Sequence, residues 1–399
     1  MARRSKGEGS VYQRPDGRWV AQIDLGYDDE GRRVRPKRVR QTKKAAVEAL
    51  NQLRRDAGIP AARENITVTE WMTLWLDDQR ARWRAGQLAP KTVVGYDTDI
   101  RHHIGPHLGS VRLDQVTAAH VERMITQILA SGRKPGTAAH VRRTLSAALA
   151  AARKEGLIEQ NVVLDVPVPK RQKQEPSAFS ADEMARITQA CETDRLGAMW
   201  LLGMLTGMRA SELCGLKWSD VDLDKGTYQV DRTLHRIGAS GAAALGTDPG
   251  LVLGAPKTEL SGKKTPLSPS VVELLKRHRT AQAKERLAAS GWTDSGHIFT
   301  SRTGTPIDPS RNARTAFDRM LARADVPNRT ADGRGRGLHE LRRTFTTVLR
   351  DQDVPLEDVQ RLGRWTSPTV LLELYAAVDE KRLRAAADRA SSALDAGSL

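Results

Sequence analysis

Residues 337–345 read Gly-Leu-His-Glu-Leu-Arg-Arg-Thr-Phe, and this stretch decides how the rest of the chain is interpreted. The three-residue spacing of His339 and Arg342 places both side chains on one face of a helix, about one turn apart. The apolar residues Leu338, Leu341 and Phe345 lie on a different part of the same helix surface, where they can anchor it against a core. We therefore expect an imidazole and a guanidinium held together at a fixed distance.

A second predicted helix contains Tyr375, with apolar residues at helical spacing around it: Val370, Leu371, Leu374 and Val378. Arginine matches phosphate oxygens in a bidentate geometry, and a tyrosine phenol can act as a covalent nucleophile. An imidazole, a guanidinium and a phenol together suit a reaction at a phosphate better than one at a carbonyl.

Residues 205–222 read Leu-Thr-Gly-Met-Arg-Ala-Ser-Glu-Leu-Cys-Gly-Leu-Lys-Trp-Ser-Asp-Val-Asp, with an arginine after a glycine turn and a glutamate three residues later. The chain thus contains, in this order, Arg209, Glu212, His339, Arg342, Trp365 and Tyr375. This constellation resembles the tyrosine recombinases, the phage-integrase family of site-specific DNA recombinases. The resemblance implies cleavage and rejoining of DNA strands through a 3′-phosphotyrosyl intermediate, in the integration or excision of a mobile element.

The resemblance implies a role for each position. Arg209 and Arg342 neutralise the non-bridging oxygens of the scissile phosphate, and Trp365 can only donate a hydrogen bond to it. His339 is the candidate proton acceptor, because its pKa range includes neutral pH. The nucleophile is the phenol of Tyr375, which needs activation because its ordinary pKa is about 10. The acidic residue Glu212 holds the site together.

Two positions of the constellation have competing candidates. The family's hairpin lysine, the candidate general acid for the departing 5′ hydroxyl, matches Lys257 in Pro-Lys-Thr, with Lys263 and Lys264 as alternatives. The family's His or Trp position usually reads Leu-Gly-His, whereas this chain reads Leu-Gly-Arg-Trp. We place Trp365 there because Thr-Ser-Pro-Thr follows it, and Arg364 is the alternative.

Composition indicates an anionic partner. The 399 residues include 64 Lys or Arg against 48 Asp or Glu, which gives a formal net charge of +16. Such an excess indicates nucleic acid or another anionic surface, and arginine clusters in every region favour nucleic acid. The resemblance implies that this partner is double-stranded DNA. With 39% hydrophobic but only 4% aromatic residues, the cores depend on Leu, Val, Ile and Ala, a mix that favours helices. The two cysteines, Cys191 and Cys214, read as packed, reduced thiols.

The chain is predicted to be mainly α with small β elements, in three domains. Residues 1–57 read as a three-stranded sheet plus helix, similar to an arm-type DNA-binding domain, with strands at 10–13, 18–26 and 32–40. Residues 66–165 read as a four-helix core-binding domain (68–83, 91–104, 118–131 and 137–155) with a break at 105–111. Residues 175–399 form the α+β catalytic domain with a C-terminal helical tail. Its expected strands lie at 227–236, 251–258 and 264–267, with a flexible Gly/Ala-rich loop at 238–250.

Basic residues in the first two domains and in the proline-rich connector between 162 and 174 are the candidate DNA contacts. They are Arg18, Arg35, Lys37, Arg38, Arg82, Arg84, Lys91, Arg142, Arg143, Lys170 and Arg171.

No cofactor or metal is expected. The glycine-rich residues 333–337 follow a polar loop and lack the Lys-Ser/Thr of a nucleotide-binding loop. Four histidines of the helical domain lack Cys or acidic partners at ligand spacing: His102, His103, His107 and His140. No apolar run reaches the roughly 18 residues of a membrane span, and the N-terminus lacks the apolar core of a signal peptide. We expect a cytoplasmic, nucleoid-associated protein that is encoded by a bacterium or phage.

Strand exchange needs four active sites, so the resemblance implies a homotetramer on DNA with core and arm sites, assisted by a directionality factor and a DNA-bending protein. One alternative is a relaxing enzyme like the type IB topoisomerases, which share the Arg, Lys, His and Tyr chemistry. A non-catalytic DNA-binding regulator with the same fold is the other.

Overall fold

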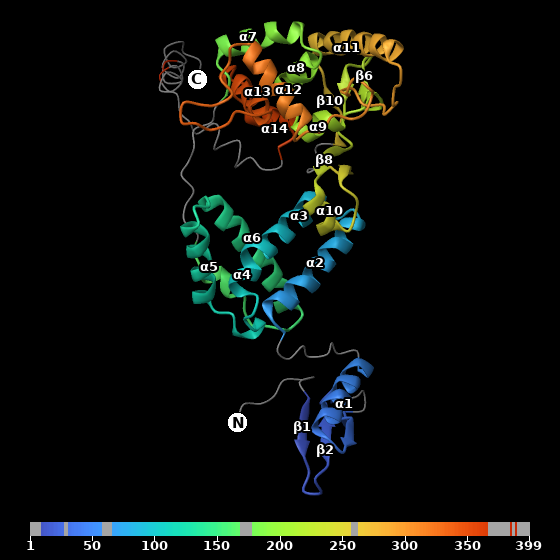
Figure 1. The fold of residues 1–399 in the computed structure, drawn as a ribbon, viewed down its shortest axis with the longest axis vertical. Helices are drawn as coiled ribbons and strands as arrows, with labels where there is room; N and C mark the ends of the chain where they lie inside the picture. Colours follow the sequence, from blue (N-terminus) through green and yellow to red (C-terminus); the bar gives the residue numbers. More distant parts are fainter. Residues whose placement is uncertain are drawn as a thin grey trace, which may run out of the picture. The chain divides into compact units, whose positions relative to one another are not determined.

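The structure is a computed structural model that describes residues 9–27, 31–57, 66–167, 178–256 and 262–365, together with Arg384 and Asp388. Contacts between residues divide the chain into two compact units (Figure 1). One unit comprises residues 1–78 and 96–171, and the other comprises residues 79–95 and 172–399.

The N-terminal part of the first unit is a three-stranded antiparallel sheet with a helix packed against it, as predicted. The strands lie in the order β1 (Ser10–Gln13), β2 (Trp19–Gln22) and β5 (Lys37–Arg40), and the helix is α1 (Lys43–Asp56). A separate short hairpin joins β3 (Gly26–Tyr27) to β4 (Arg33–Val34). Buried Ile23 and Leu50 contribute to a small core between sheet and helix.

The four helices predicted between residues 66 and 165 are present as α2 (Val68–Arg84), α3 (Pro90–Asp99), α5 (Ala118–Ala130) and α6 (Pro135–Lys154). A capping box opens α2, because the backbone N–H of Thr67 donates to Glu70 Oε2 at 2.8 Å while the N–H of Glu70 donates to Thr67 Oγ1 at 3.3 Å. The core includes Trp71, whose indole N–H donates to the carbonyl of Ala148 at 2.9 Å.

The break predicted at 105–111 begins too early, since only residues 109–111 leave the helix. The chain instead continues through a π-helical turn (Ile100–Ile104) into α4 (Gly105–Leu108). The N–H of Gly105 donates to the carbonyl of Ile100, and a Cβ on Gly105 would lie 2.9 Å from that oxygen. Glycine suits this position because the wide turn brings its Cα close to the carbonyl of Ile100. Gly105 therefore continues the helix and does not end it.

From residue 178 onward, the second unit contains eight helices and five short strands within the described residues. The helices are α7 (Ala181–Glu192), α8 (Gly197–Thr206), α9 (Ala210–Gly215), α10 (Ala239–Leu245), α11 (Pro269–Ala288), α12 (Asn312–Arg323), α13 (His339–Asp351) and α14 (Leu356–Gly363). The strands are β6 (Val221–Asp222), β7 (Thr227–Tyr228), β8 (Thr233–Ile237), β9 (Gly250–Gly254) and β10 (Thr265–Pro266). They form two antiparallel sheets, ordered β10-β7-β6 and β8-β9.

Two predictions for this unit need correction. The strand expected at 227–236 is two strands, β7 and β8, that belong to different sheets. The flexible loop expected at 238–250 contains the helix α10, since its alanines and leucine, with high helix propensity, outweigh its glycine. Gly246, in the left-handed conformation, ends this helix.

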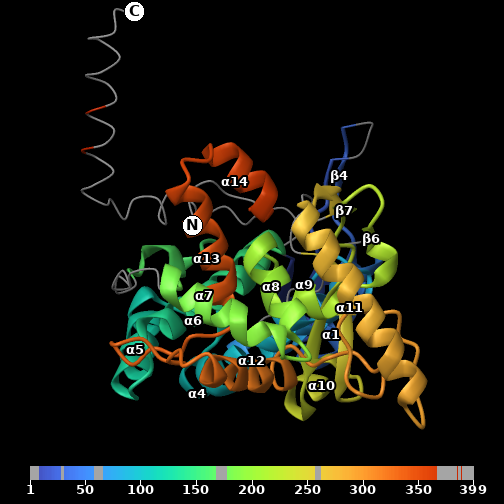
Figure 2. The ribbon, with the colours of Figure 1, turned by 90° about the horizontal axis from the view of Figure 1, so that it is seen from above.

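Helix α13 packs along α8 (Figure 2). The predicted apolar face of α13 is confirmed, since Leu338, Leu341 and Phe345 are buried. Gly207 ends α8 with a φ of +62°, and the ring of Phe345 lies against the space where a side chain would stand.

Both cysteines are buried and unpaired, and burial raises the pKa of Cys191 to about 12. Among the described residues, no helix combines the length and apolar character required to cross a bilayer.

Replacing Gly207 by Ala should lower the free energy of unfolding by about 2–4 kcal/mol, because the new Cβ would meet Phe345 at 2.5 Å in a left-handed backbone. Gly333→Ala is the matched control, since Gly333 also has a positive φ but no atom within 4 Å of the place where a Cβ would stand. The control should lose only about 1 kcal/mol. Urea denaturation followed by circular dichroism measures both, and equal losses would contradict the importance of the Phe345 contact.

Candidate active site

Arg209 and Glu212 lie at the start of α9, directly after the glycine turn that ends α8. The backbone N–H of Arg209 donates to Glu212 Oε2 at 3.0 Å, and its guanidinium donates to Glu212 Oε1 at 2.6 Å. Glu212 is fully buried, whereas about a quarter of the Arg209 side chain is exposed. The buried carboxylate therefore holds the arginine in place, and part of the arginine side chain stays accessible to solvent.

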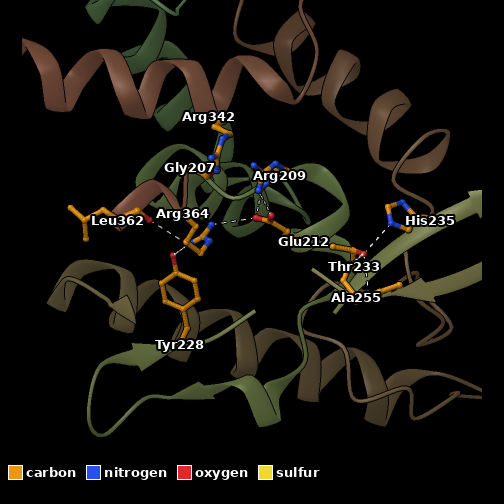
Figure 3. Close-up of polar contacts among 11 residues, drawn as sticks. Gly207, Arg209, Glu212, Tyr228, Thr233, His235, Ala255, Arg342, Leu362 and Arg364 are labelled. Carbon is orange, nitrogen blue, oxygen red and sulfur yellow. Dashed lines mark hydrogen bonds and ion pairs between the residues drawn. The ribbon is translucent and has the colours of Figure 1, made fainter. Parts of the chain in front are cut away.

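Arg342 comes from α13 and has no exposed surface. Its Nη1 donates to the carbonyl of Gly207 at 2.5 Å (Figure 3), and its guanidinium lies 4.1 Å from the centroid of the Trp365 ring. Burial, followed by the nearby charge of Arg209, lowers the pKa of Arg342 to about 9, so the group is still charged at neutral pH. Its Nε and Nη2 atoms are buried without a hydrogen-bond partner among the described residues.

His339 begins α13, one turn before Arg342, and part of the residue is exposed to solvent. Partial burial of the imidazole, together with the charges of Arg343, Arg342 and Arg209, lowers its pKa to about 4. The ring is therefore neutral at physiological pH and can accept a proton. The predicted pairing of an imidazole with a guanidinium on one helix is present.

The two candidates for the family's His or Trp position have different surroundings. Trp365 packs on Arg342, is 9% exposed, and its indole N–H is buried with no acceptor among the described residues. Arg364 points into the protein, where it pairs with Glu212 at 3.3 Å and donates to the hydroxyl of Tyr228. This geometry favours Trp365, not Arg364, as the residue at the family's His or Trp position.

The buried position of Arg364 was not anticipated from the sequence. Its partners Glu212 and Tyr228 lie more than 130 residues earlier in the chain, and a basic residue after Leu-Gly has no periodic signal that marks it as internal. Burial raises the pKa of Tyr228, which keeps its phenol protonated beside the guanidinium.

Several predicted site residues lie outside the described residues: Lys257, Tyr375, Lys170 and Arg171. The alternatives Lys263 and Lys264 are described, and both are exposed just before β10.

The candidate DNA contacts differ in how far their charges are already engaged. Eight of the nine that the structure describes are exposed: Arg18, Arg35, Lys37, Arg38, Arg82, Arg84, Lys91 and Arg143. The Nε of Arg143 donates to the carbonyl of Ala139 at 3.4 Å. Arg35 pairs with Asp24 at 3.1 Å, and Arg82 donates to the side chain of Gln79 at 3.2 Å. Arg142 donates to the carbonyls of Val166 and Leu164, so its guanidinium supports the end of the helical unit.

The predicted histidine surroundings need one correction, because His140 does have an acidic partner. Its Nδ1 lies 2.6 Å from Asp99 Oδ2. Within the described ranges, no group of three or more His, Cys, Asp or Glu side chains is placed to hold a metal ion.

Comparison with known proteins gives the family. The model of the phage integrase family matches residues 178–382, and that of the phage integrase central domain matches residues 68–167. The chain is 30% identical to an integrase of Streptomyces ambofaciens over 94% of this chain and 93% of that protein. The chain belongs to the phage integrase family.

As a phage integrase, the protein is a tyrosine-type site-specific DNA recombinase, which confirms the predicted enzyme class. The fold is similar to the Tn1549 transposon integrase in complex with transposon right end DNA, with a TM-score of 0.64, 20% identity and coverage of 81% of this chain and 99% of the other. It is also similar to a lambda integrase tetramer bound to a Holliday junction, with a TM-score of 0.52, 21% identity and coverage of 90% and 96%. These likenesses confirm the predicted fold class.

In the DNA-free protein, the His339 imidazole should remain neutral at pH 5.5, because its pKa is lowered to about 4. NMR of isotope-labelled histidine measures the titration, and His339→Gln identifies the signal. Arg343→Gln removes a neighbouring positive charge and should raise the pKa, whereas Arg319→Gln, at an exposed position of α12, should leave it unchanged. A midpoint near 6.5 in the unmodified protein would show that neither burial nor the three arginines act on the ring.

Proposed function

We propose that the phenol of Tyr375 attacks the scissile phosphate of a core site. A bond forms between the tyrosine oxygen and phosphorus, the bond to the 5′ oxygen breaks, and a 3′-phosphotyrosyl link holds the cleaved strand. The observation that supports this proposal is the buried guanidinium of Arg342, whose Nε and Nη2 have no acceptor among the described residues. A charged donor without an acceptor is costly inside a protein, and an anionic ligand removes that cost.

The charge of the site fits a phosphodiester. Arg209 and Arg342 lie close enough for their charges to interact, and the indole N–H of Trp365 adds a neutral donor beside Arg342. A phosphodiester resists nucleophiles partly because its negative charge repels them, so fixed cations lower the barrier by neutralising the two non-bridging oxygens. We assign the scissile phosphate to this position, with Glu212 as the residue that orients Arg209.

Two residues are proposed to move protons. His339 is neutral at physiological pH, so it can accept the proton of the Tyr375 phenol. Lys257 is the proposed donor to the departing 5′ hydroxyl, and it follows the end of β9 by three residues. Attack by the 5′ hydroxyl of a partner strand reverses the reaction, so the phosphotyrosyl bond conserves the energy of the original linkage and no nucleotide cofactor is needed.

Exchange of strands between two duplexes requires four cleavages, and we propose a homotetramer on DNA. The similarity in fold to the lambda integrase tetramer on a Holliday junction supports this arrangement. We further propose that residues 66–165 clamp the core site together with the catalytic domain at 175–399. The basic sheet within residues 1–57 is assigned to arm sites.

We propose that the biological role is integration and excision of a mobile element in the bacterial cytoplasm, at the nucleoid. A directionality factor and a DNA-bending protein are the proposed accessory partners, because arm and core sites must be brought together on one folded DNA segment.

Tyr375→Phe should leave binding to a core site intact and abolish covalent protein–DNA adducts, because it removes only the nucleophilic oxygen. A nicked suicide substrate without arm sites, analysed by denaturing electrophoresis, measures the adduct. Tyr27→Phe is the matched control, since Tyr27 is exposed in β3 and its loss should leave adduct formation at the normal rate. Adducts that persist in Tyr375→Phe would assign the nucleophile to another residue.

Deletion of residues 1–57 should preserve cleavage of isolated core sites and reduce recombination on arm-containing DNA by about tenfold or more, because the contacts of one basic domain are lost. Cleavage and recombination assays on both substrates separate the two effects. Equal recombination by the truncated and full chains on arm-containing DNA would exclude the arm-binding assignment.

A further inference from the structure

Arg364 occupies an unusual position for a cation. It ends α14 with a φ of +54°, in a left-handed conformation that non-glycine residues seldom adopt, and it has no exposed surface. Such a conformation persists only where the surrounding contacts hold it. Here the contacts are an ion pair with Glu212 at 3.3 Å, a hydrogen bond to the Tyr228 hydroxyl and packing over the Tyr228 ring (Figure 3).

The carboxylate of Glu212 is shared between two arginines. One oxygen accepts from the side chain of Arg209 at 2.6 Å, and the other accepts from the backbone N–H of Arg209 and the side chain of Arg364. The carboxylate therefore has charged donors on both sides and little freedom to rotate. Loss of Arg364 would leave that second oxygen with only the backbone N–H of Arg209 as a donor and allow the Glu212–Arg209 pair to shift.

The same turn sets the position of Trp365. The left-handed residue redirects the chain after α14, so that Arg364 points inward to Glu212 while the next side chain lies over Arg342. Gly363 has no side chain, and a Cβ there would lie 2.6 Å from the indole nitrogen of Trp365. One turn, residues 363–365, therefore directs Arg364 inward and places the indole of Trp365 over Arg342.

We propose that Arg364 is a positioning residue for strand cleavage: it anchors the end of α14 to Glu212 and Tyr228, and thereby aligns Arg209 and Trp365 around the phosphate. We assign it no direct contact with the substrate, because its two terminal nitrogens already bond to the Tyr228 hydroxyl and to Glu212. The inference rests on the proposed function, in which Arg209 and Trp365 bind the scissile phosphate.

The test measures single-turnover cleavage of a nicked suicide substrate at saturating full-length protein, with DNA affinity measured separately by gel shift. Arg364→Met should slow cleavage about 100-fold, as expected for misplaced catalytic groups, while the Kd for DNA changes by less than about twofold. Arg361→Met, at an exposed position of the same helix, should cleave at the normal rate. Tyr228→Phe removes one acceptor and keeps the ion pair, so it should slow cleavage by only about two- to fivefold.

A combined variant separates positioning from general weakening of the fold. If Arg364 acts through Arg209 and Trp365, then adding Arg364→Met to the pair Arg209→Lys and Trp365→Phe should slow cleavage by less than about threefold beyond that pair alone. Independent, multiplying losses would overturn the proposal. If Arg364→Met has no cooperative melting transition, Arg364→Lys decides, since it retains the charge without the fork that reaches both partners. We expect Arg364→Lys to lose about tenfold, and cleavage at the normal rate would overturn the proposal.

The outcomes also distinguish this inference from the proposed function. Normal cleavage by Arg209→Lys would refute the assignment of Arg209 to the phosphate, and with it the site itself. Slow cleavage by Arg209→Lys together with normal cleavage by Arg364→Met would leave the site intact and refute only the role of Arg364.

Discussion

The charged centre of the catalytic unit depends on one buried carboxylate. Burial of an ion is unfavourable unless it is paired and hydrogen-bonded, and Glu212 meets this requirement with a guanidinium on each side. With Arg342 nearby, three guanidinium groups surround one carboxylate, so the cluster retains a net positive charge. The carboxylate stabilises the arrangement of these charges without cancelling it, which is the condition for a site that binds an anionic group without metal.

The elements that hold this cluster come from distant parts of the chain. Helix α9 and the residue before it supply Glu212 and Arg209, α13 supplies Arg342, and the turn after α14 supplies Arg364 and Trp365. Contact between α8 and α13 brings Arg342 close to Arg209. This contact is possible because the ring of Phe345 fits only where Gly207 has no side chain. The chemistry therefore depends on the packing of two helices as much as on the charged residues themselves.

Local features could be predicted from the sequence, and long-range ones could not. The spacing of His339 and Arg342 and the capping box at Thr67 depend on residues three apart, and both are present in the structure. The helix α10 was missed because glycine and alanine give opposite local preferences, and contacts with the rest of the unit decide between them. The burial of Arg364 was missed because its partners are remote in sequence, and exposure is a property of the folded chain. The recombinase class was predictable because an ordered set of residue types can be recognised without any knowledge of their distances.

Arg342 is oriented by a peptide carbonyl, not by a carboxylate. A neutral acceptor fixes the direction of the guanidinium and leaves its full charge for the ligand. Dissolved ions weaken attractions between separated charges at the surface, but they have little access to a buried contact of this kind. Ionic strength should therefore govern how readily the enzyme captures its DNA, while the internal alignment of this arginine stays the same in dilute and concentrated salt.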